Sequence, residues 1–168
     1  MKEDFHIDMS GRLYEKGTVG IACVGSNTKN HNGCALKGKM RRYIEKNLYI
    51  GSVYKENAKI YAIAIYFLIR NNLENIDNLI ICNDENFLYV REYLYFLLDD
   101  FPYLINIINI TEFQKKLGRK VKSLADNYAK AYKKRGLKRN KWHVGIPLNV
   151  VVITFEMIKN KWNLLKKI

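Results

Sequence analysis

Residues 78–83 read Asn-Leu-Ile-Ile-Cys-Asn, and this run constrains the fold of the chain more than any other stretch. Its central residues are all apolar, so a strand formed here has no face that suits water and must be covered on both sides. Strands of this kind lie in the middle of a sheet that carries helices. We therefore expect a central strand over residues 78–83.

The segments on either side of this strand alternate between helical and extended patterns. Residues 52–71 predict the clearest helix, because Ile60, Ile63 and Phe67 recur at helical spacing. Similar patterns predict helices over residues 87–98, 123–132 and 156–168, a weaker helix over residues 37–48, and a strand over residues 104–110.

The N-terminus predicts an antiparallel hairpin. In residues 5–9 apolar side chains alternate with His6 and Asp8, so a strand there has one apolar face and one polar face. A Ser-Gly pair ends this run, residues 18–24 offer the second strand, and residues 31–36 fit a third. The expected fold is therefore α/β, with a mixed sheet of about five strands, the antiparallel hairpin first, alternating helices and strands after it, and helices on both faces.

Length and composition predict one domain over residues 1–168. The chain is 48% hydrophobic, which is enough for one core, and its two prolines mark no linker. We expect the core over about residues 5–132, with the C-terminal helix of about residues 156–168 covering it. Three widely spaced cysteines fit neither a disulfide framework nor a cysteine zinc site, and they indicate buried thiols in a reducing compartment.

No apolar signal region follows Met1, and the longest apolar run, residues 60–69, is far shorter than a membrane span. These features predict a soluble, cytoplasmic protein with no membrane partner.

Charge is the strongest global property of the chain. Lys and Arg number 29 against 16 Asp and Glu, which gives a formal net charge of +13. Most of the excess lies in residues 115–141, where Asp126 is the only acid. Such a segment favours a nucleic-acid partner, although a genome biased toward Lys and Asn would also raise the overall charge. The residues expected to contact nucleic acid are Lys115, Lys116, Arg119, Lys120, Lys122, Lys133, Lys134, Arg135, Lys138 and Arg139.

Aromatic side chains are interleaved with these basic residues. Tyr128, Tyr132 and Trp142 could stack on unpaired bases, but the two tyrosines are better explained as core residues. His6 lies on the same face of the predicted strand as Asp8. We expect it to be an ordinary polar residue rather than a residue that supports a metal ligand.

Four acids occupy distinctive positions on the predicted elements. Asp8 lies in the first strand, and Asp84 follows the buried strand at its carboxyl end, where open α/β sheets bind ligands. Glu56 begins the helix of residues 52–71 on the same face as its apolar residues, so it points toward the sheet. Asp126 flanks the small-residue face of a later helix.

In this order, the four acids resemble the catalytic residues of the ribonuclease H-like superfamily of nucleases, integrases and junction resolvases. The resemblance covers about residues 5–132. In that family an Asp in the first strand, a Glu opening the first helix, an Asp ending the fourth strand and an acid near the start of the last helix converge. The resemblance implies that Asp8 and Asp84 are the central ligands of two Mg²⁺ or Mn²⁺ ions. It implies that Glu56 and Asp126 complete the two sites.

The resemblance implies a divalent-metal-dependent nuclease, or a related phosphodiester-processing enzyme, that acts on RNA, RNA/DNA hybrid or structured DNA. Two such ions about 4 Å apart can activate a water and stabilise the leaving oxygen of a phosphodiester. A non-catalytic nucleic-acid-binding module with the same fold is the alternative, because residues 114–122 lack the His that many members carry before the last helix. A PIN-like nuclease is a third reading, which the N-terminal hairpin disfavours.

Three of the acids also have structural explanations. Asp84 could cap a helix that begins at Glu85, and Glu56 could be a first-turn acid favoured by the helix dipole. Asp126 could pair with Lys122 or Lys130 across one helical turn. No cap or pair explains Asp8.

Overall fold

The computed structural model describes residues 1–99, 105–137, 148–166 and 168. Five strands form one mixed sheet in the order β3-β2-β1-β4-β5. Strand β1 pairs antiparallel with β2 and parallel with β4, while β2 with β3 is antiparallel and β4 with β5 is parallel. The strands are β1 (Glu3–Ser10), β2 (Val19–Gly25), β3 (His31–Leu36), β4 (Ile76–Ile81) and β5 (Asn106–Asn109).

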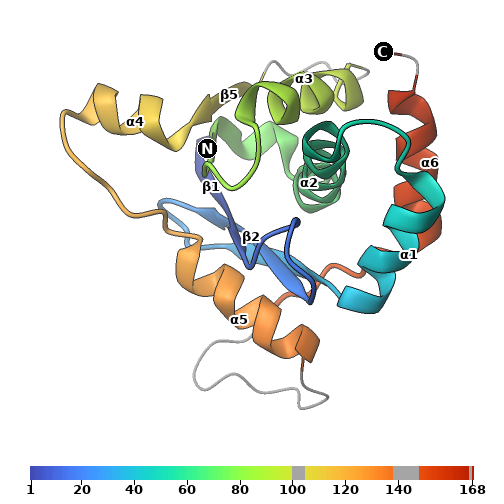
Figure 1. Cartoon of the computed structure of the whole chain (residues 1–168). Helices are drawn as coiled ribbons and strands as arrows, with labels where there is room; N and C mark the ends of the chain where they lie inside the picture. The colour runs from blue at the N-terminus through green and yellow to red at the C-terminus, as the bar shows by residue number, and fades with distance from the viewer. Residues whose placement is uncertain (100–104, 138–147, 167) are drawn as a thin grey trace.

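Helices cover both faces of this sheet. Figure 1 shows α2 above β1 and β2, with α5 below them and with α1 and α6 at one side. The helices are α1 (Gly38–Leu48), α2 (Val53–Ile69), α3 (Phe87–Leu97), α4 (Ile110–Leu117), α5 (Asp126–Leu137) and α6 (Phe155–Leu165), and a short 3₁₀ turn spans Leu73–Asn75. The predicted α/β class and mixed five-stranded sheet are therefore observed. None of the helices in the described ranges is both long and apolar enough to cross a membrane.

The alternation in β1 separates two cores. Phe5, Ile7 and Met9 are buried in the large core, which also contains the apolar residues of α2 and α3. The other face of the sheet presents Ala22, packed against α5, and Ile80, packed near α4, in two smaller apolar clusters. His6 and Asp8 belong to this second face because they alternate with the residues of the large core.

Helix α5 lies unusually close to its face of the sheet. A Cβ atom added at Gly20 would lie 2.3 Å from the carbonyl oxygen of Ala129 and 2.3 Å from the backbone nitrogen of Lys133. Gly33 lies against the ring of Tyr132, which is 1% exposed and whose hydroxyl is 3.0 Å from Nδ1 of His31. Tyr132 is thus a core residue, as predicted.

The element boundaries correct several predictions. The third strand and the weak helix after it are present as β3 and α1, and the strand predicted at residues 78–83 lies at Ile76–Ile81. The helix predicted at residues 123–132 begins at Asp126 and continues to Leu137. The prediction of one strand over residues 104–110 was wrong at its carboxyl end, because α4 begins at Ile110.

Local capping explains the unpredicted helix α4. The Asn109 side chain accepts a hydrogen bond from the Thr111 backbone nitrogen at 2.7 Å, and Gly118 ends the helix with a left-handed φ of 69°. Asn before a helix and Gly after it are the usual terminal residues.

The C-terminal helix covers the core as expected. Ile158, Trp162 and Leu165 are buried on α6, which contacts α2 and α3. Three residues of the basic segment lie outside the described residues, namely the predicted nucleic-acid contacts Lys138 and Arg139 and the aromatic residue Trp142.

Candidate metal centre

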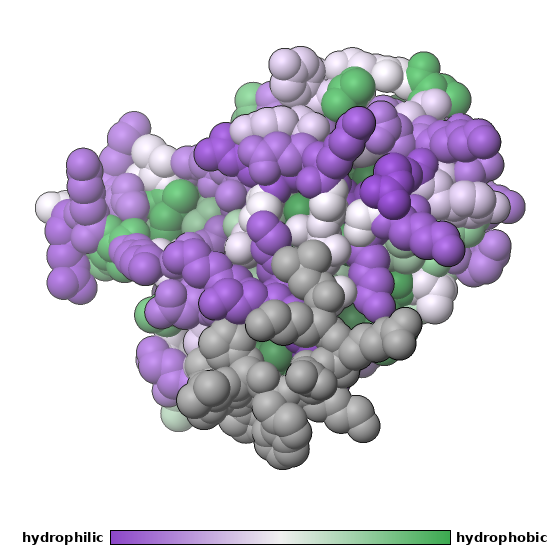
Figure 2. Space-filling model, turned by 60° about the horizontal axis from the view of Figure 1, so that its bottom comes forward, coloured by the Kyte–Doolittle hydropathy of each residue, from purple (hydrophilic) through white to green (hydrophobic). Residues whose placement is uncertain are grey.

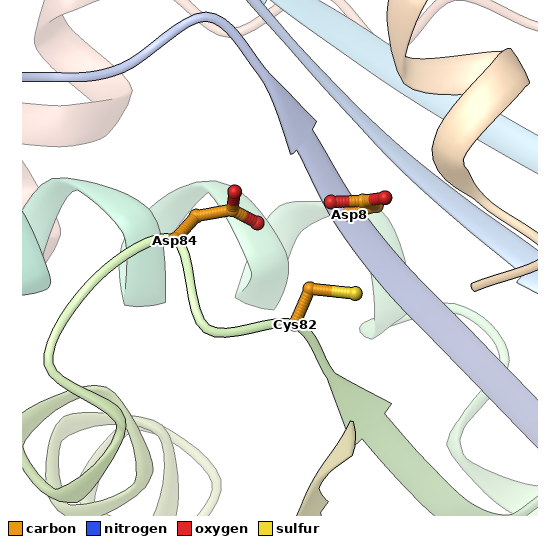
Figure 3. A group of neighbouring side chains, drawn as sticks. All are labelled: Asp8, Cys82 and Asp84. Carbon is orange, nitrogen blue, oxygen red and sulfur yellow. The ribbon is translucent and has the colours of Figure 1, made fainter. Parts of the chain in front are cut away.

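The pairing of β1 with β4 brings Asp8 and Asp84 together. Ile7 is the register partner of Ile81, and the Cys82 backbone nitrogen donates to the Ile7 carbonyl oxygen at 3.1 Å. The chain after β4 therefore continues beside β1 for one more residue before it turns. The carboxylates of Asp8 and Asp84 and the Cys82 sulfur offer ligand atoms that all lie within 4.8 Å of one another. Figure 3 shows these three side chains converging.

One backbone N–H group helps to hold both carboxylates. The Met9 nitrogen donates to Oδ1 of Asp8 at 2.8 Å and to Oδ2 of Asp84 at 3.3 Å. Asp8 is only 7% exposed, and Asp84 is half-buried. The arrangement fixes two acids at the carboxyl ends of neighbouring parallel strands, where α/β sheets bind ligands.

The charge of Asp8 disfavours ionisation of Asp84. Burial, and then the charge of Asp8 next to it, raise the pKa of Asp84 to about 8. Burial also raises the pKa of Asp8, although the hydrogen bond between its carboxyl group and that of Asp84 acts in the opposite direction. A divalent cation between two such carboxylates would replace this repulsion with attraction.

Cys82 is a neutral neighbour in this cluster. Burial and the charge of Asp8 raise the pKa of its thiol to about 12, and the thiol hydrogen bonds to Asp8. A thiol that stays protonated is a poor ligand for a hard cation, whereas carboxylate oxygens suit Mg²⁺ and Mn²⁺. The donor set therefore fits such an ion through Asp8 and Asp84.

Helix α2 adds an unsatisfied hydroxyl beside the two acids. Tyr61 is 0% exposed, and its hydroxyl has no hydrogen-bond partner within the described part of the chain. Burial first, and then the charges of Asp84, Cys82 and Asp8, raise the pKa of Tyr61 well above its usual value. A water molecule held by a cation on the acids would supply the missing partner, so the environment fits a hydrated ion.

Glu56 lies outside the group that the two aspartates form. Its Oε1 contacts Nζ of Lys59 at 2.9 Å, and its Oε2 accepts a hydrogen bond from the Ile50 backbone nitrogen at 3.3 Å. Glu56 is 2% exposed, so it does not point into solvent, but its partners are Lys59 and the Ile50 backbone and neither of them lies on the sheet. It lies in the first turn of α2, which is the structural role considered for it.

Asp126 lies near Asp8 but is held by two lysines. Its Oδ2 is 3.1 Å from Nζ of Lys122 and 3.0 Å from Nζ of Lys130. Partial burial opposes the shift, but these two ammonium groups lower the pKa of Asp126. The charge of Asp126 contributes to the raised pKa of Asp8. Both predicted pairs of Asp126 are thus present.

The structural explanation of Asp84 as a helix cap was wrong. The side chain that caps α3 is Asn86, which accepts a hydrogen bond from the Tyr89 backbone nitrogen at 3.4 Å.

The sequence interpretation also missed Glu85. Burial raises its pKa to about 7, although Arg41 acts in the opposite direction. The position of Glu85 directly after Asp84 was the available signal.

The predicted basic residues within the described ranges lie on α4, on α5 and in the loop between them. These two helices pack against the face of the sheet that carries Asp8. Lys115 and Lys116 lie in the last turn of α4, and Lys134 and Arg135 lie in the last turn of α5. Figure 2 shows hydrophilic side chains gathered over much of this side of the molecule. Of the predicted contacts within the described residues, those that are exposed are Lys115, Lys116, Arg119, Lys120, Lys122 and Lys134.

The raised pKa of Asp84 predicts a pH-dependent stability of the metal-free protein. The folded state binds the Asp84 proton more tightly than the unfolded state does, so this contribution is lost as the pH rises from about 4 to about 8. Asp84→Asn removes it, and we expect the variant to be more stable than wild type near pH 8 by on the order of 2 kcal/mol. Urea unfolding of wild type and variant in EDTA, at about pH 5 and at about pH 8, measures this difference in stability. If the free energy of unfolding depends on pH identically in wild type and variant, the expectation is wrong. Asp77→Asn, which changes an exposed residue, is the control.

Glu56→Gln tests whether that residue is structural or a ligand. The variant leaves Lys59, which is 13% exposed, without its counter-charge, so we expect a stability loss of about 2 kcal/mol. Adding Lys59→Met should recover part of the loss, as measured by urea unfolding. We expect Mn²⁺ affinity, measured by calorimetry, to change less than about threefold. A larger loss of affinity would make Glu56 a ligand.

Comparisons with protein-family models, with curated proteins and with solved structures found no match to this chain.

Proposed function

We propose that this protein is a divalent-metal-dependent nuclease, or a related phosphodiester-processing enzyme, with a ribonuclease H-like fold. The observation that carries the proposal is the meeting of Asp8, from β1, with Asp84, which follows β4. These are the two acids that the resemblance assigns to the central ligands. They lie far apart in the chain, yet the N–H group of Met9 donates to both, 75 positions before Asp84 and directly after Asp8.

The order of the strands supports the fold assignment. An antiparallel hairpin opens the chain, and the fourth strand lies parallel beside the first, so an acid after β4 is next to an acid in β1. Residues that would be helical in the PIN-like alternative form β2 instead.

Asp8 and Asp84 would hold Mg²⁺ or Mn²⁺, which supplies an acidified water and stabilises negative charge on a phosphodiester oxygen. Side chains of the protein would orient the water and attract the substrate. Tyr61 offers a buried hydroxyl to orient a water molecule, and the exposed lysines of α4 and the following loop attract the phosphate backbone. A second ion would need further carboxylates, and Asp126 is close enough for its charge to act on Asp8.

A module of this fold that binds nucleic acid without cutting it is the second candidate. Two of the four acids are engaged in ion pairs, Glu56 with Lys59 and Asp126 with two lysines. The segment between α4 and α5 also contains no His that could shuttle a proton. Both observations favour binding over turnover.

One set of measurements separates the two candidates. Purified protein is incubated with labelled RNA, RNA/DNA hybrid or branched DNA, in Mg²⁺, in Mn²⁺ and in EDTA, while calorimetry measures Mn²⁺ binding. The nuclease predicts metal binding and cleavage of at least one substrate only with metal. The binding module predicts salt-dependent nucleic-acid affinity with no metal binding. Failure to bind any nucleic acid at low salt rejects both.

A further inference from the structure

A cavity of about 640 Å³ opens directly beside Asp84. It lies between the turn after β1, the start of α2 and the loop that leads into α3. Its volume is within the range of pockets that bind small organic groups. The residues that line it are Tyr14, Val53, Tyr54, Asn57, Asp84, Glu85 and Asn86.

Two tyrosine rings stand at this cavity with most of their surface in solvent. Tyr54 is 74% exposed and Tyr14 is 61% exposed, and they come from different elements. Rings that remain so exposed contribute little to the hydrophobic core, so packing alone does not explain them. Exposed aromatic rings that line a concave site are suited to stacking on a planar group, and every nucleobase has such a face.

A buried amide lies in the wall of the same cavity. Asn57 is 3% exposed, and its Oδ1 accepts a hydrogen bond from the Tyr49 hydroxyl at 2.5 Å. This contact orients the amide within the wall of the cavity. A preoriented amide donor suits the carbonyl or ring-nitrogen acceptors at the edge of a base.

A cation lies at the rim beside one of the rings. The Nη1 atom of Arg12 donates to the Tyr14 hydroxyl at 2.6 Å, and its guanidinium carbon is 5.6 Å from the ring centroid. The charge of Asp84 is close enough to act on Arg12, so the guanidinium and the acid lie in the same region of the molecule. An arginine in that position suits a phosphate group.

We propose that this cavity receives one unpaired nucleobase of a single-stranded nucleic acid, with the phosphate next to that base lying between Arg12 and the Asp8–Asp84 pair. The inference rests on the proposed function, because it names the strand form that the same site accepts. A base in a duplex is already stacked on both faces and paired at its edge, so it would have to leave the helix to enter. Single strands and unpaired positions avoid that cost.

Anisotropy in EDTA tests the cavity separately from cleavage. The probes are a fluorescein-labelled single strand of about twelve nucleotides and the duplex of the same sequence. We expect Tyr54→Ala to weaken single-strand binding about tenfold, and duplex binding less than twofold, because stacking on a ring is lost only for the unpaired base. Tyr54→Phe keeps the ring and should bind like wild type.

Tyr43→Ala is the matched control. Tyr43 is 54% exposed but lies on α1 against Phe155, outside the cavity, so its replacement should leave both affinities unchanged. Melting curves check that each variant is folded. Unchanged single-strand affinity in Tyr54→Ala, or an equal loss for the duplex, overturns the nucleobase site.

The two proposals fail in different ways. If Tyr54→Ala loses single-strand affinity but no substrate is cleaved with any metal, the nuclease is rejected and the nucleobase site stands. If metal-dependent cleavage occurs and Tyr54→Ala binds and cleaves like wild type, the nuclease stands and the nucleobase site is rejected.

Discussion

Asp84→Asn is expected to lower metal-dependent cleavage by about a thousandfold or more, which corresponds to roughly 4 kcal/mol of transition-state stabilisation. Asp84 supplies one of the two carboxylates that converge at the ends of β1 and β4. The amide has nearly the same shape but no charge, so it cannot compensate a divalent cation. Single-turnover cleavage rates and Mn²⁺ calorimetry should show parallel losses of rate and affinity.

The expected stability of this variant makes the test clear. Burial and the neighbouring Asp8 charge already disfavour the ionised form of Asp84, so the metal-free variant should be at least as stable as wild type near neutral pH. Lost activity then cannot be ascribed to unfolding. Asp8→Asn should lose a similar amount, while Asp77→Asn, which changes an exposed residue at the amino end of β4, should keep full activity. Cleavage that persists at the wild-type rate in Asp84→Asn rejects the metal centre.

Gly20→Ala is expected to destabilise the protein by about 3 kcal/mol or more. The added methyl group would lie 2.3 Å from backbone atoms of both Ala129 and Lys133. Backbone atoms cannot rotate away as a side-chain end can, so α5 must move off β2. Urea unfolding should show the loss, and reduced protection of α5 amides in hydrogen exchange should locate it.

Gly51→Ala provides the matched control for that substitution. A Cβ atom at Gly51 would be 3.6 Å from its nearest neighbour, an Oε1 atom of Glu56, which is an ordinary contact distance. We expect its stability to remain within about 0.5 kcal/mol of wild type. Wild-type stability of Gly20→Ala would contradict the close docking of α5 on the sheet.

Glu56 shows where helical spacing stops being informative. Its alignment with Ile60, Ile63 and Phe67 correctly predicted that it is buried. Spacing shows which residues of α2 share a face, but the rotation of the helix against its neighbours is set by packing on α3 and α6. In this packing Tyr61 lies within reach of the charges of the two aspartates, and Glu56 lies beside Lys59.

The sequence by itself determined the features that depend on neighbouring residues. Alternation in β1, the apolar run of β4 and the helical spacing of α2, α3 and α6 predicted elements of the correct type, because burial of one face requires a regular spacing. The same patterns placed Asp8 in a strand and Asp84 just after one.

Only the tertiary structure decided which acids meet. Asp8 and Asp84 converge because β4 pairs in parallel with β1, and α2 adds Tyr61 and the Tyr54 side of the cavity from a third segment. Strand partners and helix rotation depend on contacts between residues far apart in the chain, and local spacing does not encode them. The long-range packing of the sheet therefore selected two of the four predicted acids as a pair.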